Sequence, residues 1–285
     1  MSGEESLFKT VGLVARYDKK QALRLAEKLS KHLTENGLEV YMENTLLHKT
    51  RIEGKPVPLE EMRTDFIITI GGDGTILRTS LSLPKPEPPI LAINMSVRGF
   101  LTEAEPQEAL EATDRCLKGE FKIEKCMKLA SKTEDMRFPD TLNEIVTYAD
   151  EPGKLLYAQI LKNNEPILNC QADGLIISTQ TGSTGYSLSA GGPVLDPSVN
   201  AFVVAPICPL SSFSPIVFPA DGNLSIKVEK PQKILVVIDG HYRQFVTSKP
   251  ISLTVTRSKN VASFIRFGDN FYHRLRSRLL FKGMR

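Results

Sequence analysis

The first third of the chain alternates short apolar strands with amphipathic helices, and this alternation restricts the fold more than any other feature. Patterns typical of buried strands occupy residues 8–15, 66–70 and 90–94. The segment 19–36, between the first two of these strands, carries alanine and leucine on one helical stripe. Strands and helices that alternate at this spacing predict a parallel sheet covered by helices.

Smaller elements complete this region. We expect a strand at 38–42, a polar loop over 44–64, and helices that begin near Thr75 and at Pro106. Asp18 is placed to cap the first helix, because an aspartate side chain accepts hydrogen bonds from the N–H groups of the first turn.

From about residue 120 the pattern changes to short β-rich runs separated by turn residues. Asp239-Gly240 and residues 258–260 are among the expected turns. Short strands with turn residues between them, and no long helix, predict an all-β region. The expected strands are 142–149, 155–162, 174–179, 202–207, 223–229, 233–239, 251–256 and 263–268.

Three segments follow from these patterns. We expect an α/β domain over residues 1–119 and a β-rich domain over 120–268. A helical pattern returns at 270–280, so a last segment, 269–285, is expected to pack back on the first domain.

The composition excludes several classes of protein. A hydrophobic fraction of 41% and a charged fraction of 24% are ordinary for globular chains and exclude disorder, collagen and coiled coil. The net charge of +3 gives no support for nucleic acid as a partner. The basic segment 271–285 is either a solvated helix face or a surface that meets phosphate or another subunit.

Other features indicate a soluble, cytoplasmic protein. The four cysteines have no C-x-x-C spacing, and the histidines are scattered, so neither a disulfide framework nor a zinc site is expected. The N-terminus lacks the apolar stretch of a signal peptide, and no apolar run approaches the roughly 20 residues of a membrane span.

The most informative motif, Gly-Gly-Asp-Gly-Thr at 71–75, directly follows the strand at 66–70. Ligands of parallel sheets bind at the carboxyl ends of strands, and glycines with a following helix N-terminus favour phosphate. We expect Gly71, Gly72 and Thr75 to form a phosphate loop. Asp73 is suited to accept the proton of a hydroxyl that attacks phosphorus. The alternative is a plain turn with an aspartate cap.

A second motif spans 181–192 and contains four glycines, five serine or threonine residues, and Tyr186. Its hydroxyl groups and aromatic face suit a nucleotide base and ribose, whereas the alternative is a flexible linker. We expect Tyr186 to lie against a bound dinucleotide; the competing interpretation is that its ring fills the core beneath the loop. Asn143-Glu144, at the start of an expected strand, indicates a functional site only in combination with these motifs.

Together these motifs resemble the NAD kinase family in order and spacing, over nearly the whole chain. The matching segments are 71–75, 94–103, 143–144, 173–192 and 239–240. The resemblance implies a Rossmann-like N-terminal parallel-sheet domain and a larger, sandwich-like β-rich domain, with the NAD site between them.

The family phosphorylates the 2′-hydroxyl of the adenosine ribose of NAD, with ATP or, in some members, polyphosphate as donor. By resemblance, Asp73 matches the general base, and Asn143 and Glu144 match the pair that holds the adenosine part. A divalent ion, Mg²⁺, is implied with ATP, and a homodimer or homotetramer is expected. The other positions that match NAD-binding residues are Gly74, Arg78, Phe100, Lys154, Gln171, Asp173, Thr184, Gly185, Tyr186 and Ser189.

The sequence departs from the family pattern at four places. Gly185 stands where the family usually has alanine, and Gln180 stands where it has proline. His241 follows Asp239-Gly240 where many members have glutamine, and the segment around Arg98 differs from the usual NLGRLGF. None of these changes removes a chemically essential group.

Two other functions stay open on the sequence alone. A lipid or sugar kinase shares the Gly-Gly-Asp-Gly-Thr loop but does not explain the hydroxyl-rich segment 181–192. A dinucleotide-binding module without catalysis, such as a redox sensor, has no need for the carboxylate of Asp73 beside phosphates, where it would weaken binding by repulsion.

Overall fold

The computed structural model describes residues 7–52, 54–97, 99–151, 153–210, 213–247, 249–268 and 271–276. The chain forms two compact units, which consist of Met1–Lys125 with Ala262–Arg285, and of Cys126–Val261. Two long strands, β6 (Lys122–Lys132) and β16 (Ile251–Arg266), contribute residues to both units.

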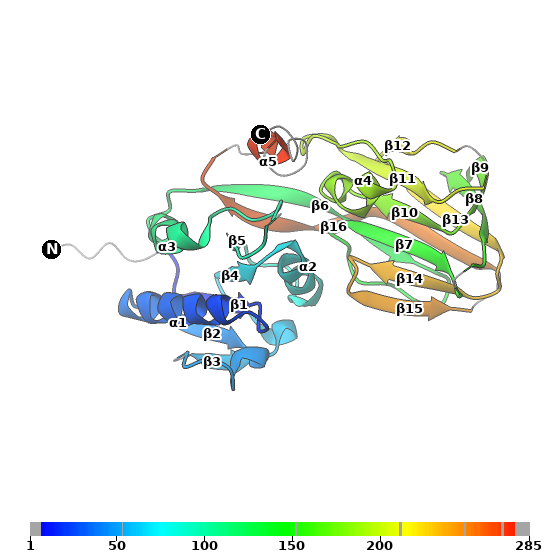
Figure 1. Cartoon of the computed structure of the whole chain (residues 1–285). Coiled ribbons are helices and arrows are strands. Elements are labelled where there is room, and N and C mark those ends of the chain that lie inside the picture. The colour runs from blue at the N-terminus through cyan, green and yellow to red at the C-terminus, as the bar shows by residue number, and fades with distance from the viewer. Residues whose placement is uncertain are drawn as a thin grey trace. The chain divides into compact units, whose positions relative to one another are not determined.

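A parallel sheet in the order β3-β2-β1-β4-β5-β16 forms the centre of the first unit (Figure 1). The strand expected at 90–94 is confirmed with the same bounds. The loop expected over 44–64 is wrong in part, because it contains β3, which pairs with β2 although its side chains are mostly exposed. The strands are β1 (Thr10–Ala15), β2 (Glu39–Glu43), β3 (Lys55–Val57), β4 (Phe66–Gly71) and β5 (Ile90–Asn94).

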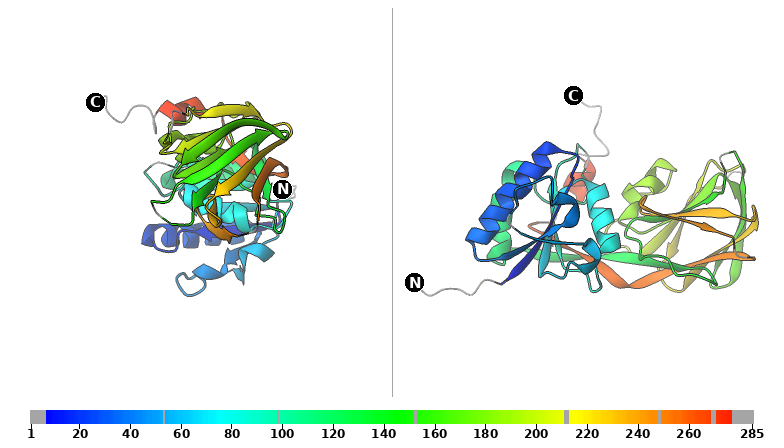
Figure 2. Two further views of the ribbon diagram at one scale, coloured as in Figure 1. Left: turned by 90° about the vertical axis from the view of Figure 1, so that its right-hand side faces the viewer. Right: turned by 90° about the horizontal axis from the view of Figure 1, so that it is seen from below.

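Helices cover both faces of this sheet, and Figure 2 shows α1 and α2 on opposite sides of its strands. Helix α1 (Lys20–Glu35) buries Ala22, Ala26, Leu29 and Leu33 in one apolar cluster with residues of α3 (Ala109–Leu117) and alternate residues of β1. Helix α2 (Asp73–Ser82) follows β4. None of the helices in the described part of the chain is long and apolar enough to cross a membrane.

The expected capping of the first helix by Asp18 is wrong. Lys19 occupies the capping position, and no side chain accepts a hydrogen bond there. The Asp18 carboxylate instead accepts hydrogen bonds from the Arg16 side chain at 2.7 and 2.8 Å. A nearby guanidinium, with two donors in a planar fork, therefore outcompetes the helix N–H groups.

The C-terminal segment returns to the first unit, as the fold prediction states. Helix α5 (Phe271–Leu275) packs the ring of Phe271 against Phe100, with centroids 5.8 Å apart. Arg274 is buried and lies 3.5 Å from the carboxylate of Glu103. One cation of the basic segment is thus part of an internal ion pair rather than of a solvated face; residues 277–285 lie outside the described residues.

The second unit is rich in antiparallel β-structure (Figure 1). One sheet has the order β12-β11-β10-β7-β14-β15, and a second group joins β16, β13, β8 and β9. The sequence analysis did not identify β6, β9, β12 and β15 as strands. The bounds are β7 (Glu144–Ala149), β8 (Leu156–Lys162), β9 (Glu165–Ala172), β10 (Gly174–Ser178), β11 (Ala201–Ile207), β12 (Ile216–Pro219), β13 (Asn223–Lys230), β14 (Ile234–Ile238) and β15 (Tyr242–Val246).

The expected turn at 258–260 is wrong, because β16 runs without interruption from Ile251 to Arg266. The polar side chains that suggested a turn bind inside the unit instead. The Ser258 hydroxyl and the Asn260 amide both donate to the carboxylate of Asp140, at 2.9 and 2.6 Å. A buried carboxylate partner thus makes these polar residues compatible with a strand.

Candidate functional site

The Gly-Gly-Asp-Gly-Thr turn joins β4 to α2. Gly71 ends the strand, and the helix begins at Asp73, two residues earlier than expected. A Cβ atom on Gly71 would collide with the Thr75 side chain, and a Cβ atom on Gly72 would lie 2.9 Å from the Cβ atom of Ser96. Both glycines therefore make room for neighbouring protein side chains in this turn.

Backbone groups of the segment after β5 hold the carboxylate of Asp73. Its Oδ2 accepts the N–H of Phe100 and its Oδ1 accepts the N–H of Leu101, both at 2.9 Å. The residue is half-buried and stands in the first turn of α2, where the helix dipole favours a negative charge. The two bonds fix the direction of the carboxylate, which is the property that a group acting on a bound hydroxyl requires.

A buried ion-pair cluster fastens this segment in turn. Arg266 donates from Nη1 to the Leu101 carbonyl at 2.9 Å and lies 3.2 Å from the carboxylate of Glu103. Its Nε donates to Glu124 at 2.6 Å, and Glu103 also accepts the N–H of Phe267 at 2.7 Å. The side chains of Arg266 and Glu103 are almost completely buried. Neither residue can be assigned a role from the sequence, because nothing in the local pattern shows that they meet.

Arg78 and Phe100 also lie in the first unit. The Arg78 guanidinium binds the carboxylate of Glu43 through two hydrogen bonds, and this ion pair raises the pKa of Arg78 above its ordinary value. A charge already compensated in this way attracts a phosphate less than a lone guanidinium does. The Phe100 ring packs edge-on against Phe271, so its visible role is packing.

In the second unit, a carboxylate organises the Asn-Glu edge, which we define as residues 142–144. Asp239 accepts the backbone N–H groups of Leu142, Asn143 and Glu144, at 2.8, 2.8 and 3.1 Å. The expected turn at Asp239-Gly240 is confirmed: the Ile238 carbonyl accepts the His241 N–H at 3.0 Å, and the two residues between them, Asp239 and Gly240, have positive φ values, 48° and 71°. The sequence predicts the turn, but not the contact of its carboxylate with a segment almost one hundred residues away.

Burial strongly affects the two carboxyl groups of this edge. Burial, and then the charge of Asp239, raises the pKa of Glu144 to about 8, against a smaller opposing effect of the Tyr186 N–H. Burial raises the pKa of Asp239 to about 6, although three backbone N–H groups and Lys128 favour its ionised form. Since two adjacent buried carboxylates repel each other, we expect Asp239 to ionise first and Glu144 to hold a proton near neutral pH.

Glu144→Gln is therefore expected to raise the free energy of unfolding at pH 8 by a few kcal/mol relative to the unchanged chain. A raised folded-state pKa means that the folded state binds the proton more tightly, so wild-type stability falls as the pH rises from about 4.5 through 8. Urea unfolding followed by circular dichroism at pH 5 and pH 8 measures the difference. Glu165→Gln, an exposed change of the same kind, is the control; an equal effect of Glu144→Gln at both pH values would contradict the assignment.

Polar atoms of the Asn-Glu edge are left without protein partners. Asn143 Oδ1 and Glu144 Oε2 are buried and form no hydrogen bond with any described residue. A buried polar atom without a partner costs about 1–3 kcal/mol. Groups in this condition are suited to bind a polar ligand that supplies the missing partners.

The hydroxyl-rich segment 181–192 is ordered against this edge and is not a flexible linker. It forms the short helices η4 (Gly182–Thr184) and α4 (Tyr186–Ser189). A Cβ atom on Gly182 would overlap the backbone of Asn143, so only glycine allows this close approach. Thr179 joins the two segments by donating its hydroxyl to the Leu142 carbonyl at 2.7 Å and accepting the Gly182 N–H at 3.0 Å.

Tyr186 and Gly185 determine which surface the segment 181–192 offers to a ligand. The Tyr186 residue is 38% exposed, and its hydroxyl lies 3.2 Å from the hydroxyl of Tyr148, so the ring does not fill the core. A Cβ atom on Gly185 would lie 3.2 Å from Glu144 Oε2. The glycine that departs from the family pattern thus leaves one methyl group of space beside the unpartnered carboxyl oxygen.

The remaining sequence-predicted residues are spread around the second unit. Thr184 donates its hydroxyl to the Thr181 carbonyl at 3.2 Å, and Ser189 is exposed. Register pairs Glu144 with Ser178 and Tyr148 with Gly174, so Asp173 lies at the end of β10 away from the Asn-Glu edge.

Two further candidates, Gln171 and Lys154, lie toward the same end of the unit as Asp173, away from the Asn-Glu edge. Gln171 is exposed on β9, and Lys154 follows the far end of β7, where it lies 3.0 Å from Glu151 and 3.5 Å from Asp150. Strands of this size are roughly 17–20 Å long. A single ligand that contacts both the Asn-Glu edge and these residues at the other end of the strands must therefore be elongated.

Comparison with known proteins assigns the chain to a family. Residues 11–121 match the ATP-NAD kinase N-terminal domain, and residues 142–267 match the ATP-NAD kinase C-terminal domain. An NAD kinase of Methanothermobacter thermautotrophicus is 37% identical over 279 residues, which cover 96% of this chain and 97% of that protein. An NAD kinase of Thermococcus sibiricus is 39% identical over 266 residues, covering 92% and 95%.

Solved structures agree with this result. An NAD kinase from Archaeoglobus fulgidus in complex with ATP has a TM-score of 0.79 and 27% identity, over 94% of this chain and 99% of that one. Yeast NADH kinase in complex with NADH shares the fold, with a TM-score of 0.89 and 22% identity, over 99% and 90% of the two chains. With both halves matched and relatives more than one-third identical over nearly its full length, the chain belongs to the NAD kinase family.

Proposed function

We propose that this protein transfers the γ-phosphoryl group of ATP to the 2′-hydroxyl of the adenosine ribose of NAD and so produces NADP and ADP. Membership of the family and the names of the relatives support the phosphotransferase class and NAD as substrate. The observation on which the mechanism rests is the carboxylate of Asp73, held in one direction by two backbone N–H groups.

In the proposed reaction, Asp73 accepts the proton of the 2′-hydroxyl while that oxygen attacks the γ-phosphorus. The new O–P bond forms as the bond between the γ-phosphorus and its bridging oxygen breaks, and ADP leaves with the electron pair. Phosphoryl transfer depends mainly on positioning and on charge stabilisation. A carboxylate whose orientation is fixed before the substrate binds meets the first of these requirements.

The Asn-Glu edge is proposed to bind the adenosine part of NAD. The oxygens Asn143 Oδ1 and Glu144 Oε2 have no hydrogen-bond partner in the protein. The hydroxyl and amino groups of an adenosine can form the missing hydrogen bonds. The partly exposed ring of Tyr186 offers a face for stacking beside this edge. Gly185 leaves room for a ligand atom next to Glu144.

Mg²⁺ is proposed to enter as part of the substrate, bound to the phosphates of ATP. Among the described residues, no group of three or more histidine, cysteine, aspartate or glutamate side chains is arranged to hold a metal ion. Phosphate oxygens and water are the ligands that Mg²⁺ commonly keeps in kinase sites.

The deciding experiment mixes the purified protein with NAD and Mg·ATP and measures NADP and ADP in equal amounts. Parallel reactions with inorganic polyphosphate as donor, and with NADH as acceptor, determine the donor and the redox form. Formation of NADP with polyphosphate alone would overturn ATP as the donor. Absence of NADP with every donor would overturn the proposed function.

A further inference from the structure

A basic pocket of about 450 Å³ lies on the second unit between the end of β6 and the middle of β16. Its volume lies in the range of small-ligand pockets. Among the described residues that line it, no side chain is acidic and none is aromatic. The lining residues are Ala130, Ser131, Lys132, Arg137, Thr254, Thr256, Arg257, Lys259 and Asn260.

Four of these side chains are cationic, and the charge of three is not compensated. Lys132, Arg257 and Lys259 are exposed and form no ion pair with any acidic side chain in the described part of the chain. Four cations that converge on one concavity repel one another, and a bound anion relieves this repulsion.

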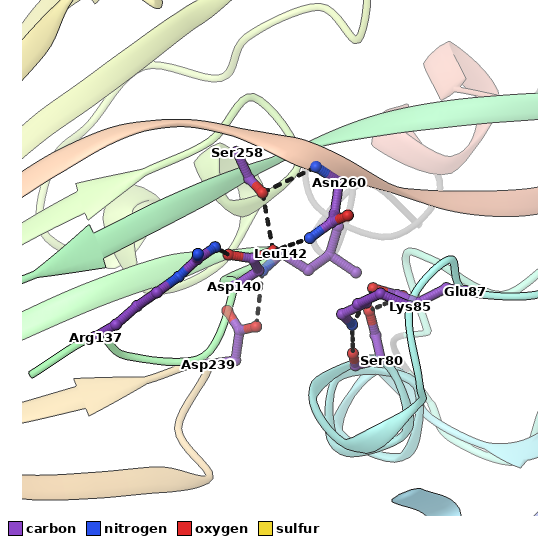
Figure 3. Close-up of polar contacts among 9 residues, drawn as sticks. All are labelled: Ser80, Lys85, Glu87, Arg137, Asp140, Leu142, Asp239, Ser258 and Asn260. Carbon is purple, nitrogen blue, oxygen red and sulfur yellow. Dashed lines mark hydrogen bonds and ion pairs between the residues drawn. The ribbon is translucent and has the colours of Figure 1, made fainter. Parts of the chain in front are cut away.

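The carboxylate of Asp140 binds two residues of the pocket lining, Arg137 and Asn260 (Figure 3). Its Oδ2 accepts the Asn260 amide at 2.6 Å and the Ser258 hydroxyl at 2.9 Å, and Arg137 lies 3.4 Å from its Oδ1. Burial alone would raise the pKa of Asp140, but these hydrogen bonds outweigh it and hold the pKa below its ordinary value. Asp140 therefore offsets one cation at most and leaves an excess of positive charge.

The wall of the pocket also contains a buried hydroxyl group. Ser131 lines the pocket, is 2% exposed, and its Oγ has no hydrogen-bond partner among the described residues. A buried hydroxyl in a native protein is normally hydrogen-bonded. The Oγ of Ser131 is enclosed by protein, so the cationic side chains, and not this hydroxyl, would hold an anion in the pocket.

The chemistry of the lining distinguishes among anions. Because no described residue of the lining is aromatic, a nucleobase would find no stacking partner among these residues, although phosphate oxygens would find several cationic donors. A single phosphate would fill only part of a volume of about 450 Å³. We propose that the basic pocket binds a short inorganic oligophosphate, at a site separate from the Gly-Gly-Asp-Gly-Thr turn and the Asn-Glu edge.

Isothermal titration with sodium tripolyphosphate tests this proposal on the full chain. The double substitution Arg257→Gln with Lys259→Gln is expected to weaken binding by about a hundredfold, because each charged hydrogen bond is worth roughly tenfold or more. Arg24→Gln with Lys28→Gln, which removes one arginine and one lysine from the exposed face of α1, is the matched control and should bind like the wild type.

Four results would overturn the proposal. The first is wild-type affinity in the pocket variant, and the second is an equal loss in the α1 control, which would show that only overall charge matters. The third is a changed oligomeric state of the pocket variant in sedimentation, which would assign these cations to a contact between copies. Unchanged kcat and KM for Mg·ATP would support a separate site, whereas a raised KM for ATP would place the cations in the donor site and overturn it.

Discussion

Asp73→Asn is expected to reduce kcat for NADP formation by about 10²–10⁴-fold, the usual effect of losing a general base. The asparagine side chain has almost the same shape but cannot accept the proton of the 2′-hydroxyl. The KM for NAD should change much less, because the Asn-Glu edge of the second unit is untouched. Initial rates at several NAD concentrations separate the two parameters; near-normal kcat would remove Asp73 from the mechanism.

Asp73→Asn is also expected to lower the stability of the folded protein, because it disrupts one of the two hydrogen bonds to the carboxylate. Asp73 accepts one N–H at each carboxyl oxygen, whereas asparagine offers one oxygen and one NH₂ group. One backbone N–H would then face another donor, at a cost of about 1–3 kcal/mol. Unfolding in urea quantifies this loss, and the kinetic comparison should be made where both proteins are fully folded.

Arg266→Met is expected to lower the free energy of unfolding by about 3–5 kcal/mol, the range observed when one partner of a buried ion pair is removed. Methionine fills similar volume but leaves the buried carboxylate of Glu103 with the N–H of Phe267 and the more distant cation of Arg274, at 3.5 Å. The substitution also removes the donor that holds the Leu101 carbonyl, and the N–H of Leu101 orients the carboxylate of Asp73. We therefore expect kcat to fall by a larger factor than that by which the KM for NAD rises.

Two controls make this prediction specific. Arg63→Met changes an exposed arginine in the same unit and should be nearly neutral. Adding Glu103→Gln to Arg266→Met should recover part of the lost stability, because the abandoned buried charge is gone. The chain contains no tryptophan, so circular dichroism is the suitable probe. A loss below about 1 kcal/mol would show that the cluster is not a determinant of stability.

Local patterns predicted elements of this fold where a continuous apolar run dictates burial. The strand at 90–94 has no polar residue before its last position, and every residue of it is buried. Prediction failed where a polar residue finds a distant partner. Residues 258–260 have the composition of a turn, but Asp140, more than one hundred positions away, turns them into part of a strand.

The candidate site shows the same division. The motifs that contain Asp73, Asn143 and Glu144 could be identified from spacing and resemblance. The contacts that hold them, made by Asp239 and Arg266, could not, because these contacts join positions 95 and 165 residues apart. Residue types within a motif indicate chemistry, whereas the support of that motif depends on tertiary contacts that no local period encodes.

The cluster around Arg266 also has a consequence for synthesis of the chain on the ribosome. Cys126–Val261 is continuous in sequence, but the first unit needs residues from both of its flanks. Domains usually fold as units from the N-terminus during translation. Here the inserted unit can fold first, whereas the backbone that orients Asp73 is fastened only after residue 266 has emerged. A nascent chain that is stalled before residue 266 emerges should therefore contain the complete Gly-Gly-Asp-Gly-Thr motif and yet have no kinase activity.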